Sequence, residues 1–261
     1  MNITIIGAGN MGGALAKGWA AAGENVTVTA RTQGTLDRIQ AECPQLRTSF
    51  DNIEALRSAD VIVLGVKPWL IEGVCAQIRE HIDIDRQLLC SLAAGISTQQ
   101  LRDWTYSNGP SAFAVMPNIA AEFRQSMTFV APAAKTPQHD VDTVERLFRL
   151  VGDVYVCEEH LMDPGMVMAG CGIAYVMRYL RAQTEAGVEM GFRPGDALNI
   201  ALQTMQGTVT LLRETGLHPE EAIDRVTTAG GRAIRGLNAM DHEGFNSAVI
   251  RSMKAGLQSG N

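Results

Sequence analysis

The chain has 261 residues, of which 46% are hydrophobic and 19% charged, a composition typical of globular rather than disordered proteins. The formal net charge is −6 and no basic run is present, which argues against nucleic acid as the main partner. The longest apolar stretch, residues 166–177, is too short to cross a bilayer. The first residues lack the basic segment and cleavage site of a signal peptide. We therefore expect a cytoplasmic protein with no membrane partner.

The five cysteines are scattered, odd in number and free of C-x-x-C spacing, and the five histidines do not cluster. On this pattern we expect neither a disulfide scaffold nor a metal site. Reduced thiols in a cytoplasm are the simplest interpretation.

Short β-branched segments alternate with helix-period segments in the first part of the chain. The apolar run 60–66 is typical of a strand that is buried on both faces of a parallel sheet. Such alternation predicts an α/β doubly wound domain over residues 1–158. The expected strands are 2–6, 25–30, 60–66, 87–92, 111–115, 127–131 and 154–157, and the expected helices are 11–22, 35–42, 70–81 and 140–151.

Residues 159–261 contain no strand candidate of any length, so we predict an all-α domain. A long helix-period segment spans 162–191, a second helix runs from Pro194 to about Thr215 with Gly216 as its stop, a third begins at Pro219, and the last covers 245–257. Methionine and alanine recur along 162–190, which is more typical of core packing than of a ligand site. A large apolar homodimer interface would account for these small residues.

A glycine motif, Gly7-x-Gly9-x-x-Gly12, follows the first expected strand and opens the first expected helix. In this context it predicts a Rossmann dinucleotide site, in which the glycines allow a tight turn, a close approach to a pyrophosphate and close helix packing. Free N–H groups at the helix start would bind the phosphates. The alternative is a glycine-rich turn without a ligand. The same turn contributes Ala8, Asn10 and Met11 as candidate cofactor contacts.

Arg31 and Thr32 follow the second expected strand, where an NAD-preferring site would carry a carboxylate. An arginine can pair with the 2′-phosphate of NADP, whereas a carboxylate would repel it. We therefore predict NADPH as cofactor, with NADH possible. The alternative is that Arg31 is a solvated surface residue.

Ligands in doubly wound sheets bind at the carboxyl ends of the strands. Three further segments end there, 65–68, 93–95 and 116–118, and we expect them to wall the nicotinamide side of the cleft and to supply candidate cofactor contacts. Lys67 is placed to reach a ribose or phosphate, unless it is a plain surface lysine. The candidates are Gly65, Val66, Lys67, Pro68, Ala94 and Asn118.

The motifs together resemble the pyrroline-5-carboxylate reductase family over nearly the whole length. The N-terminal motifs are shared by several reductases, and the later ones are more specific. The N-terminal ones are Gly7–Gly12, Asp51-Asn52, Val66–Pro68, Ala94–Ile96 and Met116–Asn118; the later ones are Gly170–Tyr175, Glu185–Val188, Gly191, Gln203-Thr204, Gly207, His218-Pro219 and Val226–Gly231.

The resemblance implies a nucleotide-binding domain followed by a helical domain that builds an interlocked dimer, which in many members assembles further. It implies reduction of the cyclic imine 1-pyrroline-5-carboxylate to L-proline, the last step of proline biosynthesis, with NADPH or NADH. Carried over by motif, Asn52 joins the cofactor contacts, and a turn with backbone N–H groups at a helix start holds the substrate carboxylate. The implied substrate contacts are Gly172, Thr227, Thr228, Gly230, Gly231 and Arg232.

The chain departs from the family pattern near the expected substrate site. The family's threonine that is thought to contact the imine nitrogen falls on Ala233, its frequent arginine before M-P-N falls on Ala114, and a frequent glutamate falls on Arg181. Candidate replacements as proton donor are Thr227, Thr228 and Tyr175, although each threonine is equally well explained as a helix cap.

Other functions stay open. A 3-hydroxy acid reductase would need a lysine on a helix of the second domain, but the only lysine after residue 158 is Lys254, near the C-terminus. Two alternatives remain. One is a reductase of a different cyclic imine, because the shape of the pocket decides which ring size fits. The other is a non-catalytic NADPH-binding protein, which the substitutions at Ala233 and Ala114 favour.

Overall fold

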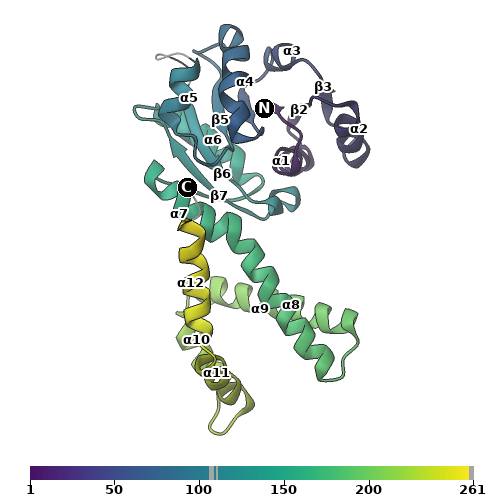
Figure 1. Cartoon of the computed structure of the whole chain (residues 1–261), viewed down its shortest axis with the longest axis vertical. Coiled ribbons are helices and arrows are strands. Elements are labelled where there is room, and N and C mark those ends of the chain that lie inside the picture. The colour runs from purple at the N-terminus through teal and green to yellow at the C-terminus, as the bar shows by residue number, and fades with distance from the viewer. Residues whose placement is uncertain (106–108, 110, 259–261) are drawn as a thin grey trace. The chain divides into compact units, whose positions relative to one another are not determined.

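The structure is a computed structural model that describes residues 1–105, 109 and 111–258. It divides into two compact units, Met1–Gly170 and Cys171–Asn261, and each is described by itself (Figure 1). The sequence-based division into 1–158 and 159–261, drawn where the pattern becomes all-helical, stays a prediction.

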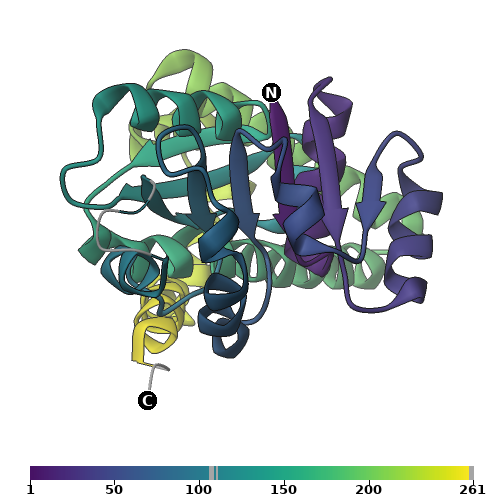
Figure 2. The ribbon, with the colours of Figure 1, turned by 90° about the horizontal axis from the view of Figure 1, so that it is seen from above.

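The first unit is built on a sheet with strand order β3-β2-β1-β4-β5-β6-β7-β8 among the described residues (Figure 2). All neighbours from β3 to β6 are parallel, β7 runs antiparallel to β6, and β8 is parallel to β7. This topology confirms the doubly wound prediction. The strands are β1 (Asn2–Ile6), β2 (Asn25–Thr29), β3 (Arg47–Ser49), β4 (Val61–Leu64), β5 (Leu88–Ser91), β6 (Ala112–Met116), β7 (Ser126–Pro132) and β8 (Gly152–Val156).

Helices cover both faces of this sheet. In β4, Val61 and Val63 belong to one buried cluster, and Ile62 and Leu64 belong to another. Alternate side chains of one strand therefore enter two separate cores, as expected for a strand buried on both faces. The helices are α1 (Asn10–Ala21), α2 (Gln33–Glu42), α3 (Asn52–Leu56), α4 (Ile71–Ile78), α5 (Thr98–Thr105), α6 (Gln138–Arg149) and α7 (Met162–Gly165), with single 3₁₀ turns at η1 (Pro68–Leu70), η2 (Arg79–His81), η3 (Ile119–Phe123) and η4 (Glu159–Leu161).

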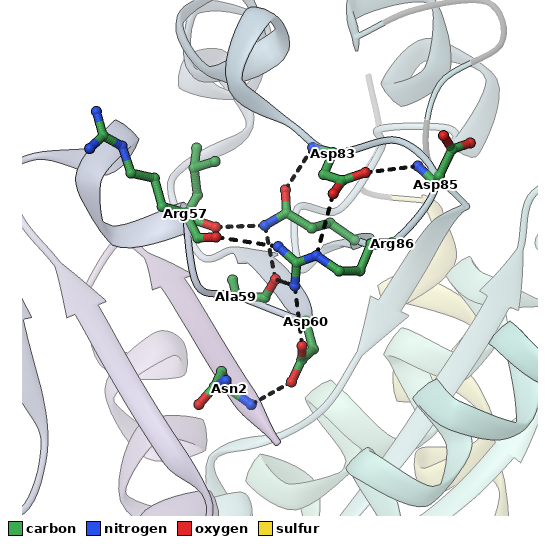
Figure 3. A network of polar contacts seen from close by, with 9 residues as sticks. Asn2, Arg57, Ala59, Asp60, Asp83, Asp85 and Arg86 are labelled. Atoms are coloured by element: carbon green, nitrogen blue, oxygen red, sulfur yellow. Dashed lines mark hydrogen bonds and ion pairs between the residues drawn. The ribbon is translucent and has the colours of Figure 1, made fainter.

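The amino ends of the central strands are joined by a polar network (Figure 3). The guanidinium of Arg86 donates to the carbonyl of Ala59 at 2.9 Å and pairs with Asp60 at 3.3 Å. The amide nitrogen of Gln87 donates to the carbonyls of Leu56 and Ala59 at 2.6 and 2.8 Å. The carbonyl of Leu56 thereby accepts from Gln87 as well as from the N–H of Ala59, and the carbonyl of Ala59 accepts from both Arg86 and Gln87.

The second unit is entirely helical within its described residues. It consists of α8 (Gly172–Glu189), α9 (Pro194–Thr215), α10 (Pro219–Val226), α11 (Arg232–His242) and α12 (Phe245–Gln258). Gly216 has a φ of 63° and ends α9 in the left-handed conformation, as the sequence predicted. Of these helices, α11 was not expected from periodicity.

The predicted long helix over 162–191 is present, since residues 162–189 are helical without a break, but the helix type changes along it. A π-helical segment, Met166–Cys171, separates α7 from α8. The side-chain amide of Asn118, which precedes η3, donates to the carbonyl of Ala169 inside this segment at 3.3 Å. A side chain that takes a carbonyl in this way competes with the regular α-helical ladder, which is a known cause of such interruptions.

Across the described ranges, no helix is both long enough and apolar enough to span a membrane. Within the same ranges, no three His, Cys, Asp or Glu side chains are grouped so that they could hold a metal ion.

Candidate active site

A cleft of about 1090 Å³ lies where β1, β2, β4 and β5 end. Every residue predicted to contact the cofactor lines this cleft except Gly12 and Asn118. Further lining residues that the sequence analysis did not single out include Thr35, Arg38, Phe50, Trp69, Gly73 and Gln77. The cleft therefore sits at the edge of the sheet where ligands of this fold class bind.

The glycine loop forms the floor of the cleft. Gly7 has a φ of +111°, and its N–H and that of Ala8 both donate to the carbonyl of Thr29, at 3.0 and 3.1 Å. A side chain on Gly12 would lie 2.1 Å from the Gly7 carbonyl oxygen, so this glycine permits close packing rather than ligand contact. Gly9 precedes α1, and a Cβ there would meet nothing within 4 Å. No side chain caps α1, so its first N–H groups are available to an anion in the cleft.

Positive charge and hydroxyl groups gather at the end of β2. Arg31 and Thr32 line the cleft there, and the hydroxyl oxygens of Thr32 and Thr35 are 2.8 Å apart. Arg38 reaches the same wall from α2, where its guanidinium donates to the carbonyl of Ala8 at 3.4 Å. Two arginines and two threonines are the groups that bind a phosphate well.

A chain of ion pairs orients Arg38. Its guanidinium lies 3.3 Å from the carboxylate of Glu42, and Glu42 lies 2.6 Å from the ammonium of Lys17 on α1. The hydrogen bond with Glu42 raises the pKa of Lys17, and the hydrogen bond with Lys17 lowers the pKa of Glu42. Both groups stay charged at neutral pH, so Glu42 remains an acceptor for Arg38. The sequence analysis did not single out Arg38, because only the fold brings this part of α2 to the cleft.

Asn52 is fixed on both sides of its amide. The hydroxyl of Thr29 donates to Asn52 Oδ1 at 2.6 Å, and Asn52 Nδ2 donates to Gln77 Oε1 at 2.9 Å. The preceding residue, Asp51, caps α3 by accepting from the N–H of Ile53 at 2.8 Å. This series of contacts connects the end of β2 to α3 and then to α4.

Asn118 does not line the cleft. It is 7% exposed, its Oδ1 accepts from the N–H of Ala120 at 3.0 Å, and its Nδ2 donates to Ala169. These contacts cap η3 and hold the π-helical segment. The cofactor contacts predicted for Asn118, for Gly12 and for the residues that line the cleft all stay predictions.

A smaller pocket of about 280 Å³ shares Ala93 and Ala94 with the cleft, and it is lined by the ends of β5 and β6 and by residues 159–163. Glu159 shapes its wall, because its carboxylate accepts from the N–H of Thr98 at 2.6 Å and from its hydroxyl at 2.8 Å. This contact caps the first turn of α5.

The predicted substrate turn lies in the second unit, before α11. Gly230 has a φ of +67°, and the N–H of Gly231 donates to the carbonyl of Thr228 at 2.9 Å. Arg235 folds back over the turn and donates to the carbonyls of Gly230 and Gly231, at 2.8 and 3.3 Å. No side chain caps α11, so its first N–H groups, beginning with Arg232, and the Arg235 cation are close together. Such a helix start suits a carboxylate.

The candidate proton donors have structural partners. The hydroxyl of Thr227 donates to the carbonyl of Asp224 at 3.3 Å, and the phenol of Tyr175 on α8 donates to the carbonyl of Ser252 on α12, also at 3.3 Å. The Thr228 hydroxyl lies above Gly231, where an added Cβ would approach it to 2.5 Å. Gly172 is buried at the first position of α8. The catalytic and substrate roles of these residues stay predictions.

Comparison with known proteins identifies the family. Residues 159–260 match the family model "Pyrroline-5-carboxylate reductase dimerisation", and residues 2–95 match "NADP oxidoreductase coenzyme F420-dependent". A pyrroline-5-carboxylate reductase of Methanosarcina acetivorans is 32% identical over 99% of this chain and 97% of its own length. Pyrroline-5-carboxylate reductase 1 of Dictyostelium discoideum is also 32% identical, over 96% of this chain, which spans about half of that longer relative (48%).

A solved pyrroline-5-carboxylate reductase of Coxiella burnetii superposes with a TM-score of 0.88 at 27% identity, over 98% of this chain and 96% of that one. The superposed region includes both units of this chain. The chain belongs to the pyrroline-5-carboxylate reductase family.

Proposed function

We propose that this protein reduces the C=N bond of 1-pyrroline-5-carboxylate with NADPH and so produces L-proline. The observation that carries the proposal is the cleft with a glycine-loop floor and a basic end, in a chain whose whole length matches a reductase of that name in Methanosarcina acetivorans. The site residues form three binding regions: one for the phosphates of NADPH, one for its adenosine end and one for the carboxylate of the substrate.

The cleft fits a dinucleotide phosphate. The open space at Gly9 and the uncapped start of α1 suit the pyrophosphate, and Arg31 with Arg38 suits a 2′-phosphate. Asn52, held by Thr29 and Gln77, offers a fixed amide to a ribose hydroxyl. Lys67 and Ala94 line the part of the wall nearest β4 and β5. When bound, NADPH supplies the hydride, and the protein's task is to position it and to exclude water.

The substrate turn supplies binding rather than acid catalysis. Backbone N–H groups at the start of α11 and the Arg235 cation bind the carboxylate of the imine. A protonated imine is already an electrophile, so its reduction does not need a strong acid. Because Ala233 has no hydroxyl, a contact to the ring nitrogen falls to Thr227, Thr228, Tyr175 or water.

A homodimer completes the second unit. In α9 the only buried residues are Ala197 and Ala201, while five large apolar side chains are exposed. Helices α10 and α11 bury no residue at all. A helical unit without a core of its own is stable when a second copy covers its apolar faces. The exposed side chains on α9 are Leu198, Ile200, Leu202, Val209 and Leu211. The cytoplasm is the proposed compartment, given the reduced state of the five cysteines.

The test is the loss of NADPH absorbance with the purified protein and 1-pyrroline-5-carboxylate, with NADH in parallel and proline quantified as product. The wild-type protein is expected to prefer NADPH. Arg31→Asp is expected to lower the NADPH-to-NADH ratio of kcat/KM by about 100-fold, because a charge-assisted contact is lost and a repulsive one is added. Arg213→Asp, on α9, is a charge-matched control.

Wild-type preference for NADH would contradict the assignment of Arg31. Tight NADPH binding without turnover of this imine would contradict the substrate and not the cofactor site. Cyclic imines with six-membered or sulfur-containing rings would then be the next substrates to measure, because Ala233 and Ala114 differ from the family pattern.

A further inference from the structure

Two aromatic side chains stand exposed on the wall of the cleft. Phe50 is 57% exposed and Trp69 is 77% exposed, although the first unit buries most of its large apolar side chains, among them Trp19 and Phe113. Phe50 follows β3 directly and Trp69 lies in η1, after β4. Large apolar surface that is held in water beside a ligand cleft is a mark of a binding surface.

The same cleft has an open position at Gly73. Gly73, on the first turn of α4, lines the cleft, and a Cβ built there would meet no atom within 4 Å. Its φ is not positive, so the backbone conformation does not require glycine. The missing side chain therefore leaves room on the cleft side of α4 for a flat group.

The surroundings place this space at the adenosine end. Thr29 at the end of β2 binds Asn52, and Asn52 binds Gln77, one turn further along α4 than Gly73. Phe50 lies two residues before Asn52. The wall thus continues from the end of β2, where Arg31 and Thr32 suit the 2′-phosphate. The group attached to the same ribose as that phosphate is the adenine base.

We propose that Phe50 and Trp69 form an aromatic clamp that holds the adenine of the dinucleotide against α4 at Gly73. The proposal rests on the proposed NADPH-dependent function and adds the residues that bind the base. Bases stack on aromatic rings without regard to charge, so the clamp contributes equally to NADPH and NADH. Arg31 then supplies the preference between them, and the clamp supplies affinity common to both.

The experiment measures dissociation constants by calorimetry, in the absence of imine, for NADPH, NADH, adenosine 2′,5′-bisphosphate and reduced nicotinamide mononucleotide. Trp69→Ala is expected to weaken the three adenine-containing ligands about ten-fold and by the same factor. Binding of the mononucleotide, which lacks adenine, is expected to stay as in the wild type. Trp69→Phe is expected to keep most of the affinity, and Phe123→Ala removes an aromatic ring that is 75% exposed but lies outside the cleft, as matched control.

A second variant separates binding from folding. Gly73→Leu fills the empty position, and since leucine has a higher helix propensity than glycine it is expected to keep or raise the thermal midpoint. It is expected to weaken adenosine 2′,5′-bisphosphate at least as much as Trp69→Ala.

Unchanged affinity of adenosine 2′,5′-bisphosphate in both Trp69→Ala and Gly73→Leu would overturn the clamp and leave the proposed function intact. Equal weakening of the mononucleotide would also overturn it, because the rings would then contact the nicotinamide side. If the wild type binds neither NADPH nor the bisphosphate, the proposed function itself fails.

Discussion

At the scale of single residues, three glycines from separate segments meet beneath the cleft. A Cβ on Gly12 would lie 2.1 Å from the Gly7 oxygen, one on Gly7 would lie 2.9 Å from the backbone of Gly65, and one on Gly65 would lie 2.9 Å from the Gly7 oxygen. This contact brings the backbones of β1, α1 and the end of β4 together. The motif spacing predicted that Gly7 and Gly12 are needed for a tight turn and close packing. Gly65 was predicted only as a cofactor contact, and its packing against Gly7 was not foreseen.

These contacts give Gly9 and Gly12, two glycines of one motif, different roles. Gly12→Ala is expected to lower the free energy of unfolding by about 2–3 kcal/mol, because the added methyl group overlaps a backbone oxygen that cannot move freely. Gly9→Ala, whose Cβ would meet open space, is expected to change it by less than about 1 kcal/mol. Urea denaturation of both variants measures the difference, and equal midpoints would contradict this assignment of roles.

At the scale of elements, the two ends of the sheet are built differently. Loops at the carboxyl ends expose glycines and side chains to the cleft, whereas the amino ends are held by buried hydrogen bonds. Gln87 is 1% exposed, donates to two carbonyls and accepts from the N–H of Asp83 at 2.9 Å. This end therefore contributes stability rather than binding.

Gln87→Leu tests that division. The change removes two hydrogen bonds to carbonyls that keep Arg86 and the Ala59 N–H as donors, and it leaves the N–H of Asp83 without its acceptor. It is expected to cost about 2 kcal/mol of unfolding free energy, with no effect on the dissociation constant of NADPH in the folded protein. Gln138→Leu, which removes an exposed contact to Asp142, is the control and is expected to cost less than about 0.5 kcal/mol. A Gln87 variant as stable as that control would show that the network is dispensable.

Sequence patterns predicted the elements that carry strong periodicity and missed the short ones. β3 spans three residues and α3 five, which is too short for either period to be recognised. α5 and α11 are polar and were overlooked for that reason. The π-helical segment at 166–171 was invisible because its composition is that of a helix, and only the contact from Asn118, which is distant in sequence, distinguishes it.

In the candidate site, too, the sequence predicted the residues that belong to local patterns and missed the others. Glycine spacing, the basic end of β2 and the ends of the expected strands are local signals, and most of the cofactor residues predicted from them line the cleft. Asn52 was predicted only from the family resemblance. Phe50, Trp69 and Arg38 belong to no local pattern. An aromatic residue in a sequence is expected to be buried, and only the fold shows that these two are exposed beside a cleft.

At the scale of the whole molecule, the exposed apolar surface of the second unit leads to a prediction about the proposed homodimer. Light scattering at micromolar concentration is expected to give at least twice the 28.1 kDa mass of one chain. Leu211→Glu places a charge on the exposed apolar side of α9 and is expected to lower both the mass and the thermal midpoint. Ile84→Glu, an exposed apolar position in the first unit, is the matched control. A wild-type mass of one chain would contradict the dimer.

The glycine contact beneath the cleft also limits how this sequence can change over evolutionary time. In most of a core, a larger residue at one position can be accommodated when a neighbour becomes smaller. Gly7, Gly12 and Gly65 face one another's backbone, and no residue is smaller than glycine. No partner substitution can therefore restore the lost space, so a saturation library is expected to retain only glycine at these three positions.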